Sequence, residues 1–236
     1  LKSPVANDEC GAWDQATFGQ LRGSNTRRAT DALHGFNQQD YNWQGSVSVQ
    51  HELRANVALN VGYFRTSYGA LLATDNQAVK PADYDPFCVT VPNDSRLPGG
   101  GGNQVCGLYD IKPTLFGQVN NLVTQVSHYG KQTEVYNGLD VTLKARFGDG
   151  GQLAGGLSTG RTVTDTCDLN TLPQVLPNTI GGIAVSTTIL TPRLPGYCRI
   201  SRPWAAATQV KFLAIYPLPW DFQASATYMN IPGIPI

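Results

Sequence analysis

The chain has 236 residues, of which 17 are basic and 17 acidic, so its net charge is zero and no basic surface for nucleic acid is expected. Charged residues make up 14% of the chain, well below the about 25% that is typical of soluble domains. The 25 glycines and 15 prolines disfavour long helices, and no apolar run approaches the length of about 18 residues that a membrane-spanning helix needs. Strands of a membrane barrel need only about 9–11 residues each, so the composition leaves a β-barrel open.

Residues 1–38 are polar and are predicted to be irregular, whereas residues 39–236 are predicted to form a β-rich segment. The sequence starts at LKSPVANDEC, without an initiator Met or a signal peptide, and finishes at NIPGIPI. We therefore expect that it belongs to a longer polypeptide.

The first hairpin is predicted from the stretch YNWQGSVSVQHEL, in which apolar and polar residues alternate with a period of two. One side carries the residues Tyr41, Trp43, Val47, Val49 and Leu53. This pattern is typical of a β-strand over 39–53. A short break and a second alternating run predict its antiparallel partner over 56–70.

The same alternation predicts four more strands, at 134–147, 152–165, 204–216 and 221–230. The turn GDGG is a strong hairpin signal between the first two, and PLPW joins the last two. Six strands in three hairpins predict an all-β fold of antiparallel, up-and-down strands.

The connections between these strands differ in length in an ordered way, because turns of three or four residues alternate with long connections at 71–133 and 166–203. Membrane barrels have short turns on one side and long loops on the other, whereas soluble sandwiches do not need to separate short from long connections in this way. We therefore predict part of a transmembrane β-barrel with long extracellular loops. A soluble β-sandwich, in which apolar faces pack on each other, is the alternative.

Four of the five cysteines fall in pairs within the long connections. Cys88 and Cys106 lie in the first connection, and Cys167 and Cys198 lie in the second. We predict that each pair forms a disulfide that staples its loop, which indicates an oxidising compartment. Zinc binding is the alternative, but no histidine stands at ligand spacing from a cysteine. Cys10 has no predicted partner.

No catalytic group, metal site or cofactor motif is predicted, so we do not expect an enzyme. The stretch PGGGGNQ lacks the Lys-Ser/Thr of a phosphate-binding loop, and the aspartates near it do not match a calcium loop. Any ligand is expected to bind to aromatic and basic side chains on the loops, because loops on a rigid barrel carry recognition. The candidates are Tyr84, Phe87, Tyr109, His128, Arg193, Tyr197 and Arg199.

Several stretches, among them NWQGSVSVQHELRANVALNVGYFRTSYG, YGKQTEVYNGLDVTLKARF and GGLSTGRTVTDTC, carry a resemblance beyond this pattern. They resemble the C-terminal barrel portion of TonB-dependent-receptor-like outer-membrane proteins, of the type with an N-terminal carboxypeptidase-regulatory-like domain. The resemblance implies a barrel of about 22 strands, a plug in its lumen and uptake of a large nutrient, such as a metal chelate or an oligosaccharide. The sequence contains no plug and no coupling box, so the resemblance assigns no site residue.

The expected function is therefore that of a receptor or transporter segment in the bacterial outer membrane. Its partners would be membrane lipid and a periplasmic energy-coupling protein, which would act through a region outside this sequence. Six strands cannot close a single-chain membrane barrel, since these start at eight strands. Self-association through strand edges thus gives a first alternative, a structural or adhesive assembly at the cell surface or outside the cell. A soluble β-rich carbohydrate-binding module is the second alternative.

Overall fold

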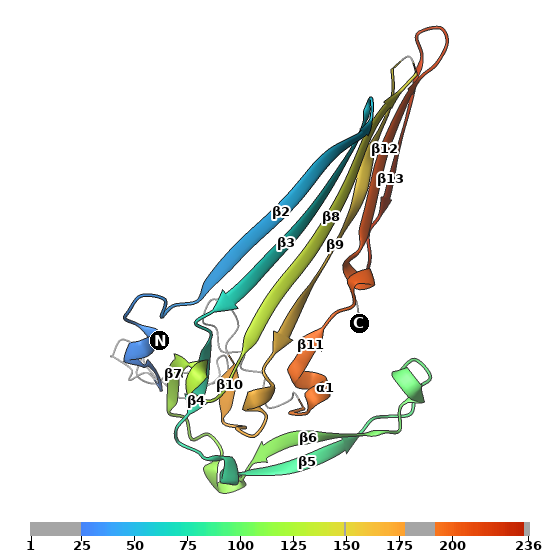
Figure 1. Cartoon of the computed structure of the whole chain (residues 1–236). Helices are drawn as coiled ribbons and strands as arrows, with labels where there is room; N and C mark the ends of the chain where they lie inside the picture. Colours follow the sequence, from blue (N-terminus) through green and yellow to red (C-terminus); the bar gives the residue numbers. More distant parts are fainter. Residues whose placement is uncertain (1–24, 149, 178–191, 234–236) are drawn as a thin grey trace, which may run out of the picture.

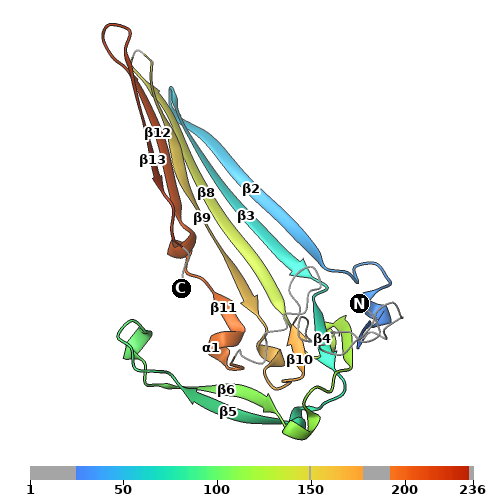
Figure 2. The same ribbon diagram turned by 180° about the vertical axis from the view of Figure 1, so that it is seen from behind.

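A computed structural model describes residues 25–148, 150–177 and 192–233 of the chain. The protein is all-β, and its long strands form one antiparallel sheet (Figures 1 and 2). In their order across this sheet, the long strands are β13 (Gln223–Asn230), β12 (Gln209–Pro217), β9 (Gly151–Asp165), β8 (Thr133–Phe147), β3 (Val57–Gly69) and β2 (Tyr41–Arg54). The short strand β11 (Arg199–Ser201) pairs with β9 beyond the end of β12.

Three tight turns lie together at one end of the long sheet, which we call the turn end (top in Figure 1). Asn56 between β2 and β3 has a φ of +68°, and Gly148 after β8 has a φ of +55°. Asparagine and glycine enter this left-handed region at low cost, so both turns suit their sequences. The third turn closes with a hydrogen bond of 2.7 Å from Leu218 N to Phe222 O.

The opposite end of the long sheet, which we call the loop end, carries a smaller sheet and a separate hairpin (Figure 1). The strands of the smaller sheet are β1 (Thr26–Arg28), β7 (Asn121–Gln125), β4 (Leu72–Asn76) and β10 (Val175–Pro177), in this order. The hairpin consists of β5 (Tyr84–Thr90) and β6 (Gln104–Ile111), and it crosses beneath α1 in Figure 1. The loop end is thus built from segments of both long connections and of the N-terminal region.

Helical structure among the described residues is limited to single turns. The α-helical turn is α1 (Pro195–Cys198). The 3-10 turns are η1 (Thr30–Ala32), η2 (Pro81–Asp83), η3 (Pro98–Gly100), η4 (Pro113–Leu115), η5 (Val126–His128), η6 (Cys167–Leu169) and η8 (Trp204–Ala207). These turns join strands, and η8 also packs against β9, where Thr159 donates a hydrogen bond to the carbonyl of Trp204 and Arg161 lies over the Trp204 ring.

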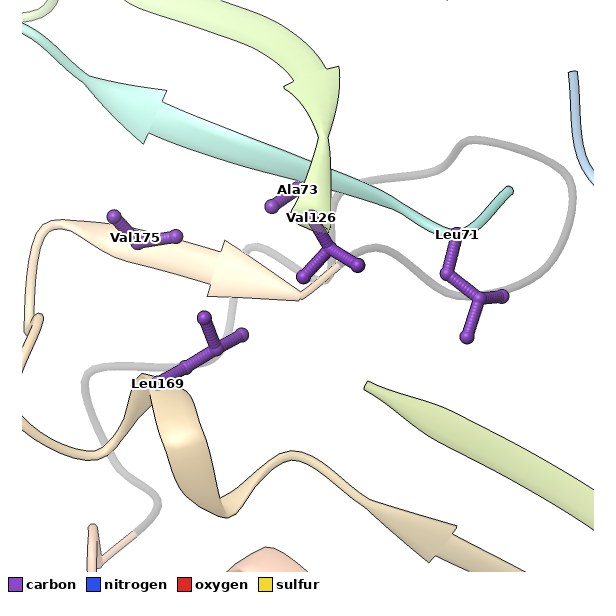
Figure 3. Packing of buried hydrophobic residues seen from close by; sticks show 5 residues of the cluster. All are labelled: Leu71, Ala73, Val126, Leu169 and Val175. Carbon is purple, nitrogen blue, oxygen red and sulfur yellow. The ribbon is translucent and has the colours of Figure 1, made fainter. Parts of the chain in front are cut away.

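The hydrophobic core lies at the loop end, not in the long sheet. Its main cluster comprises Leu71, Ala73, Val126, Leu169 and Val175, which converge from β4, η5, η6 and β10 (Figure 3). A second cluster of Ala32, Leu72 and Val123 lies on the other side of β4. Strand β4 is therefore buried on both faces, which explains its short apolar run.

The six long strands form a single layer, and apart from the contact of η8 with β9 near the loop end, no described element packs on them as a second layer (Figures 1 and 2). Glycines occupy the only fully buried positions in these strands. Large apolar side chains remain exposed instead, with Trp43 at 70%, Val47 at 63% and Val49 at 64% of their full exposure. A soluble sandwich would need a second layer on the apolar side, and the described residues form no such layer.

The strands coincide closely with those that the alternation predicts, with one exception. The fifth predicted strand begins at residue 204, whereas β12 begins at Gln209 and η8 occupies the preceding residues. The described parts of the connections 71–133 and 166–203 contain six short strands, so these parts are more ordered than their polar, Gly- and Pro-rich composition predicts. In the region 1–38, residues 25–38 contain β1 and η1, and residues 1–24, with Cys10, lie outside the described part.

Both predicted disulfides are confirmed. Cys88 pairs with Cys106 across the β5–β6 hairpin, and their Cα atoms are 4.0 Å apart. Cys167 in η6 pairs with Cys198 in α1 at a Cα separation of 4.8 Å. Each disulfide closes a segment within one long connection, as the spacing of the cysteines predicts.

Candidate functional site

Three of the seven candidate ligand residues come together at the loop end. Tyr84 lies opposite Ile111, and Pro86 lies opposite Tyr109, so the two tyrosines occupy the same face of the β5–β6 hairpin. Burial raises the pKa of Tyr84, although the nearby positive charge of Arg193 acts in the opposite direction. Burial lowers the pKa of Arg193, and Tyr109 and Tyr84 oppose that change. The guanidinium of Arg193 thus lies within electrostatic range of both phenols, and we call these three residues the tyrosine–arginine group.

Arg193 in this group is fixed by main-chain oxygens. Its guanidinium donates hydrogen bonds to the carbonyls of Leu169 at 2.9 Å, Val175 at 3.0 Å and Pro173 at 3.3 Å. Its backbone N–H donates to the carbonyl of Gly107 at 2.7 Å. Arg193 therefore joins the hairpin to η6 and β10. These hydrogen bonds stabilise the fold and do not require a ligand.

The approach of the hairpin to Arg193 depends on Gly107. This residue has a φ of +76°, and a Cβ atom on it would lie 2.8 Å from Cγ of Leu194. A side chain would thus meet both an unfavourable backbone conformation and a neighbouring residue. The glycine lets the two long connections touch.

The other four candidates lie apart from this group. His128 contacts Asp31 through Nε2 and Oδ2 at 2.7 Å, and Arg199 lies 3.8 Å from Asp165. Phe87 and Tyr197 are 40% and 42% exposed. Among the described residues, no hydrogen bond or ion pair links these four side chains to Tyr84, Tyr109 or Arg193.

A polar pair in the smaller sheet was not predicted from the sequence. Tyr129 donates a hydrogen bond of 3.0 Å from its hydroxyl to Oδ2 of Asp75. Burial raises the pKa of Asp75, and burial together with Asp75 raises the pKa of Tyr129 to about 12. The negative charge of Asp75 also contributes to the raised pKa of Tyr84, after burial and Asp83. Tyr129 and Asp75 are 54 residues apart, and no local motif reveals such a contact.

Asp31 is a second polar centre in the same region. It accepts hydrogen bonds from Thr124 Oγ1 at 2.9 Å and contacts His128 at 2.7 Å. Partial burial acts to raise the pKa of Asp31, but the hydrogen bonds from His128 and Thr124 outweigh it and hold the pKa below its usual value. The described residues contain no group of three or more His, Cys, Asp or Glu side chains able to hold a metal ion.

The long sheet has one apolar face, which the strand register defines. Residues directly opposite each other on neighbouring strands point to the same side. Two central rows of this face are Val49–Val61–Val141–Leu157–Val210 and His51–Leu59–Leu143–Gly155–Phe212–Tyr228. Along β8 the apolar face runs without a charge from Leu139 to Phe147, and Phe147 stacks on Tyr216 at the turn end with ring centres 6.2 Å apart.

The other side of the sheet, the polar face, carries hydroxyls, amides and charges. Two of its rows are Gln50–Asn60–Thr142–Gly156–Lys211–Met229 and Ser48–Gly62–Asp140–Ser158–Gln209. Ser158 donates a hydrogen bond of 2.5 Å to Asp140 across β8 and β9. Toward the loop end, the ring of Tyr136 lies over Gly138 and Gly160, which are opposite each other on β8 and β9. The ring occupies the space that side chains at these two positions would fill.

The apolar face changes character at one row near the loop end. There Gly45, Arg65, Asn137 and Arg161 lie opposite one another on β2, β3, β8 and β9. We call this set the arginine row. The alternation within each strand does not predict it, because it arises only when the register of all four strands is known.

No family of proteins, curated protein or solved structure matches the chain in comparisons of sequence and fold. Within the described residues, no helix has the length and apolar character needed to cross a membrane. The arrangement of the two sheet faces and of the loop end is therefore the basis for assigning a function.

Proposed function

We propose that the long sheet is a segment of a β-barrel in the bacterial outer membrane, with its apolar face toward lipid and its polar face toward a hydrated lumen. The segment would belong to a receptor that takes up a large nutrient, such as a metal chelate or an oligosaccharide, by a TonB-dependent mechanism. The observation that carries the proposal is the single-layer sheet, on whose apolar face the described residues form no second layer and large apolar side chains stay exposed.

The length of the apolar face supports this assignment. Leu139–Phe147 comprises nine residues of β8, and at a rise of about 3.3 Å per residue they span about 26 Å along the strand. A membrane strand needs about 9–11 residues, and barrel exteriors carry an apolar band about 25 Å tall. Removing a valine or leucine side chain from water contributes about 1.5–3 kcal/mol of favourable free energy. Contact with lipid would therefore stabilise this face, whereas exposure to water would not.

The two ends of the sheet also fit a barrel segment. Tight turns lie at the turn end, and the described parts of both long connections lie at the loop end, as in outer-membrane barrels with short periplasmic turns and long outer loops. Both disulfides lie at the loop end, which suits an oxidising exterior. In this proposal the group of Tyr84, Tyr109 and Arg193 lies in the region that captures the nutrient.

The open edges of the sheet require further strands. Among the described residues, β2 and β13 each pair on one side only. Unpaired backbone groups in lipid cost several kcal/mol each, so both edges need partners in a membrane. We assign these partners to other strands of a larger barrel, as the sequence resemblance implies, and in vesicles that hold this chain alone we assign them to the edges of neighbouring copies.

The same open edges favour a second candidate function, a structural or adhesive assembly of many chains. The edge strand β2 has 14 residues with neither proline nor lysine, the residues that commonly protect edges from pairing. This candidate predicts that purified chains grow into multimers in lipid-free buffer. A carbohydrate-binding module in solution is less favoured, because the exposed apolar face would have no cover.

Paired arginine substitutions at neighbouring positions of β8 test the membrane assignment. Val141→Arg places a charge on the apolar face, and Thr142→Arg places the same charge on the polar face one residue away. Arginine at the lipid-facing midplane costs about 2–4 kcal/mol, so V141R should strongly reduce insertion of the full chain into phospholipid vesicles. T142R is the matched control and should insert like the wild type. Equal insertion of both variants, or a wild type that remains outside vesicles, would contradict the proposal.

A further inference from the structure

The arginine row places two positive charges on an otherwise apolar face. Arg65, Asn137 and Arg161 are directly opposed on three adjacent strands, so their side chains leave the sheet on the same side. The row lies two residues beyond Leu139, on the loop-end side of the apolar stretch of β8. It therefore marks the border at which this face stops being apolar.

No acidic side chain in the described part of the chain pairs with these charges. Neither arginine forms an ion pair within the described residues. The rows on either side are Trp43–Ser67–Val135–Val163 and Val47–Tyr63–Leu139–Thr159, which contain no acid. Because strands lie about 4.8 Å apart, the two arginines start about 10 Å from each other and repel unless an anion lies near them.

Neutral and aromatic groups hold the row in place. Oδ1 of Asn137 accepts hydrogen bonds from Arg65 Nη1 at 2.9 Å and from the hydroxyl of Tyr63 at 2.7 Å. Arg161 lies over the ring of Trp204, with its guanidinium carbon 5.4 Å from the ring centre. The Nε atom of Arg161 is shielded from solvent and has no hydrogen-bond acceptor in the described part of the chain.

A depression of about 390 Å³ adjoins the row on β2 and β3. Its lining includes Trp43, Val47, Tyr63, Arg65 and Gly45, and a Cβ atom on Gly45 would meet nothing within 4 Å. Trp43 is 70% exposed beside this opening. Tryptophans thus flank the row on both sides, Trp43 near Arg65 and Trp204 against Arg161, and tryptophan is enriched at membrane–water interfaces.

We propose that the arginine row is a binding site for the phosphate of an anionic lipid headgroup at the loop end of the membrane-spanning sheet. Guanidinium groups recognise phosphate through charge-assisted hydrogen bonds, and the depression at Gly45 provides room for the headgroup beside an apolar face that accepts the acyl chains. A lipid fits both features, because its phosphate would lie at the arginines and its acyl chains would lie on the apolar face. This inference rests on the proposed function, since it requires that the apolar face contact lipid.

The experiment uses the full chain in phosphatidylcholine vesicles that contain spin-labelled phosphatidylglycerol or, separately, spin-labelled phosphatidylcholine. The fraction of label immobilised by the protein gives the relative affinity for the anionic headgroup. Wild type should prefer phosphatidylglycerol, and Arg65→Gln or Arg161→Gln should each weaken this preference about fivefold, the equivalent of about 1 kcal/mol per basic residue at a membrane surface. Arg65→Lys should keep part of the preference for phosphatidylglycerol, because lysine retains the positive charge but lacks the planar guanidinium that binds a phosphate with two hydrogen bonds.

Arg146→Gln is the matched control, because Arg146 lies near the turn end on the polar face, and its variant should bind like the wild type. If R65Q/R161Q inserts normally and keeps the full preference, the headgroup site is wrong while the proposed function stands. Displacement of the labelled lipid by inorganic phosphate at constant ionic strength would show a site for free anions and would also overturn the proposal. A wild-type chain that fails to enter the vesicles would instead overturn the proposed function, and the headgroup site with it.

Discussion

At Gly156, β9 leaves no space for a side chain. A Cβ atom there would collide with the carbonyl oxygen of Val141 and would lie 2.9 Å from Cα of Thr142. Both are backbone atoms of β8, which cannot rotate away as a side chain can. The residue type at this position therefore controls how closely β8 and β9 pair.

We predict that Gly156→Ala destabilises the sheet by about 1–3 kcal/mol, the usual cost of forcing extra volume into a packed region. Gly45→Ala is the matched control, because a Cβ atom at Gly45 meets nothing within 4 Å. That control should be neutral or slightly stabilising, since alanine restricts the unfolded chain. The urea midpoint of the detergent-solubilised chain measures both, and equal midpoints would contradict the role assigned to Gly156.

Asp31 gives a prediction that depends on pH. Its pKa in the folded state is below the ordinary value of about 3.9, so its charged form stabilises the fold above that pH, and this contribution is lost as the pH falls through the folded-state pKa. At neutral pH, Asp31→Asn should lower the local stability of β7 by about 1 kcal/mol, a modest value because the pair with His128 is partly exposed.

Hydrogen exchange at the β7 amides would measure this effect at several pH values. The difference between wild type and D31N should be present at neutral pH and should shrink below about pH 4. Asp85→Asn on the exposed side of the β5–β6 hairpin serves as the control and should change β7 at no pH. A difference that is independent of pH would contradict the part played by the carboxylate charge.

The contacts of single residues differ in whether the sequence predicts them. The alternation around Leu139 and Val141 is local, so the apolar side of β8 is visible from the sequence. The joining of Arg65 to Asn137 is not visible, because it depends on a register between strands that are separated by a long connection. The three carbonyl contacts of Arg193 are hidden for the same reason, although its residue type had marked it as a candidate.

Among the elements, the β5–β6 hairpin depends most on a covalent link. The Cys88–Cys106 disulfide spans 18 residues and holds the strands where their register shifts between Phe87 and Val89. Beyond it, the tip is a glycine-rich turn with the exposed pair Arg96 and Asp94. This tip has few apolar contacts, so the disulfide should supply much of its local stability.

Replacing Cys88 and Cys106 together by serine should lower the closing free energy of the hairpin by about 3 kcal/mol, the loop-closure value for this length. Amide exchange in β5 should accelerate by about two orders of magnitude, whereas exchange in β8 and β9 should stay unchanged. The double variant Cys167→Ser/Cys198→Ser is the control, since it releases a different connection. Unchanged exchange in β5 would show that the hairpin holds without its disulfide.

Long strands are predictable from this sequence, and short ones are not. Strand β2 alternates over 14 residues and ends at a turn that asparagine favours, so local signals agree. Strand β4 has five residues that are buried on both faces, and it pairs with β7 almost fifty residues later. The parallel pairing of β1 with β7 spans about ninety-five residues. Period-two reasoning cannot detect such strands, because burial on both faces removes the alternation.

At the scale of the whole molecule, the protein divides into a covered part and an uncovered part. The loop end has a hydrophobic core, two disulfides and a network of polar contacts. The described part of the long sheet has no buried hydrophobic cluster and no disulfide. It is held by strand pairing and by a few side-chain hydrogen bonds, and its two faces differ in chemistry. Such a sheet is stable only where something other than water covers its apolar face, and lipid is the cover that we propose.

The most direct measurement is a nitroxide scan of β8 at positions 139–144, one label per variant, in the full chain reconstituted in phospholipid vesicles. Cys10→Ser removes the one cysteine outside the two disulfides. Collision rates with oxygen, which dissolves in lipid, and with a water-soluble nickel complex report the surroundings of each label. We predict a period of two, with oxygen contact highest at 139, 141 and 143 and nickel contact highest at 140, 142 and 144. High nickel contact at all six positions would mean that water bathes both faces, and it would contradict the membrane-spanning sheet.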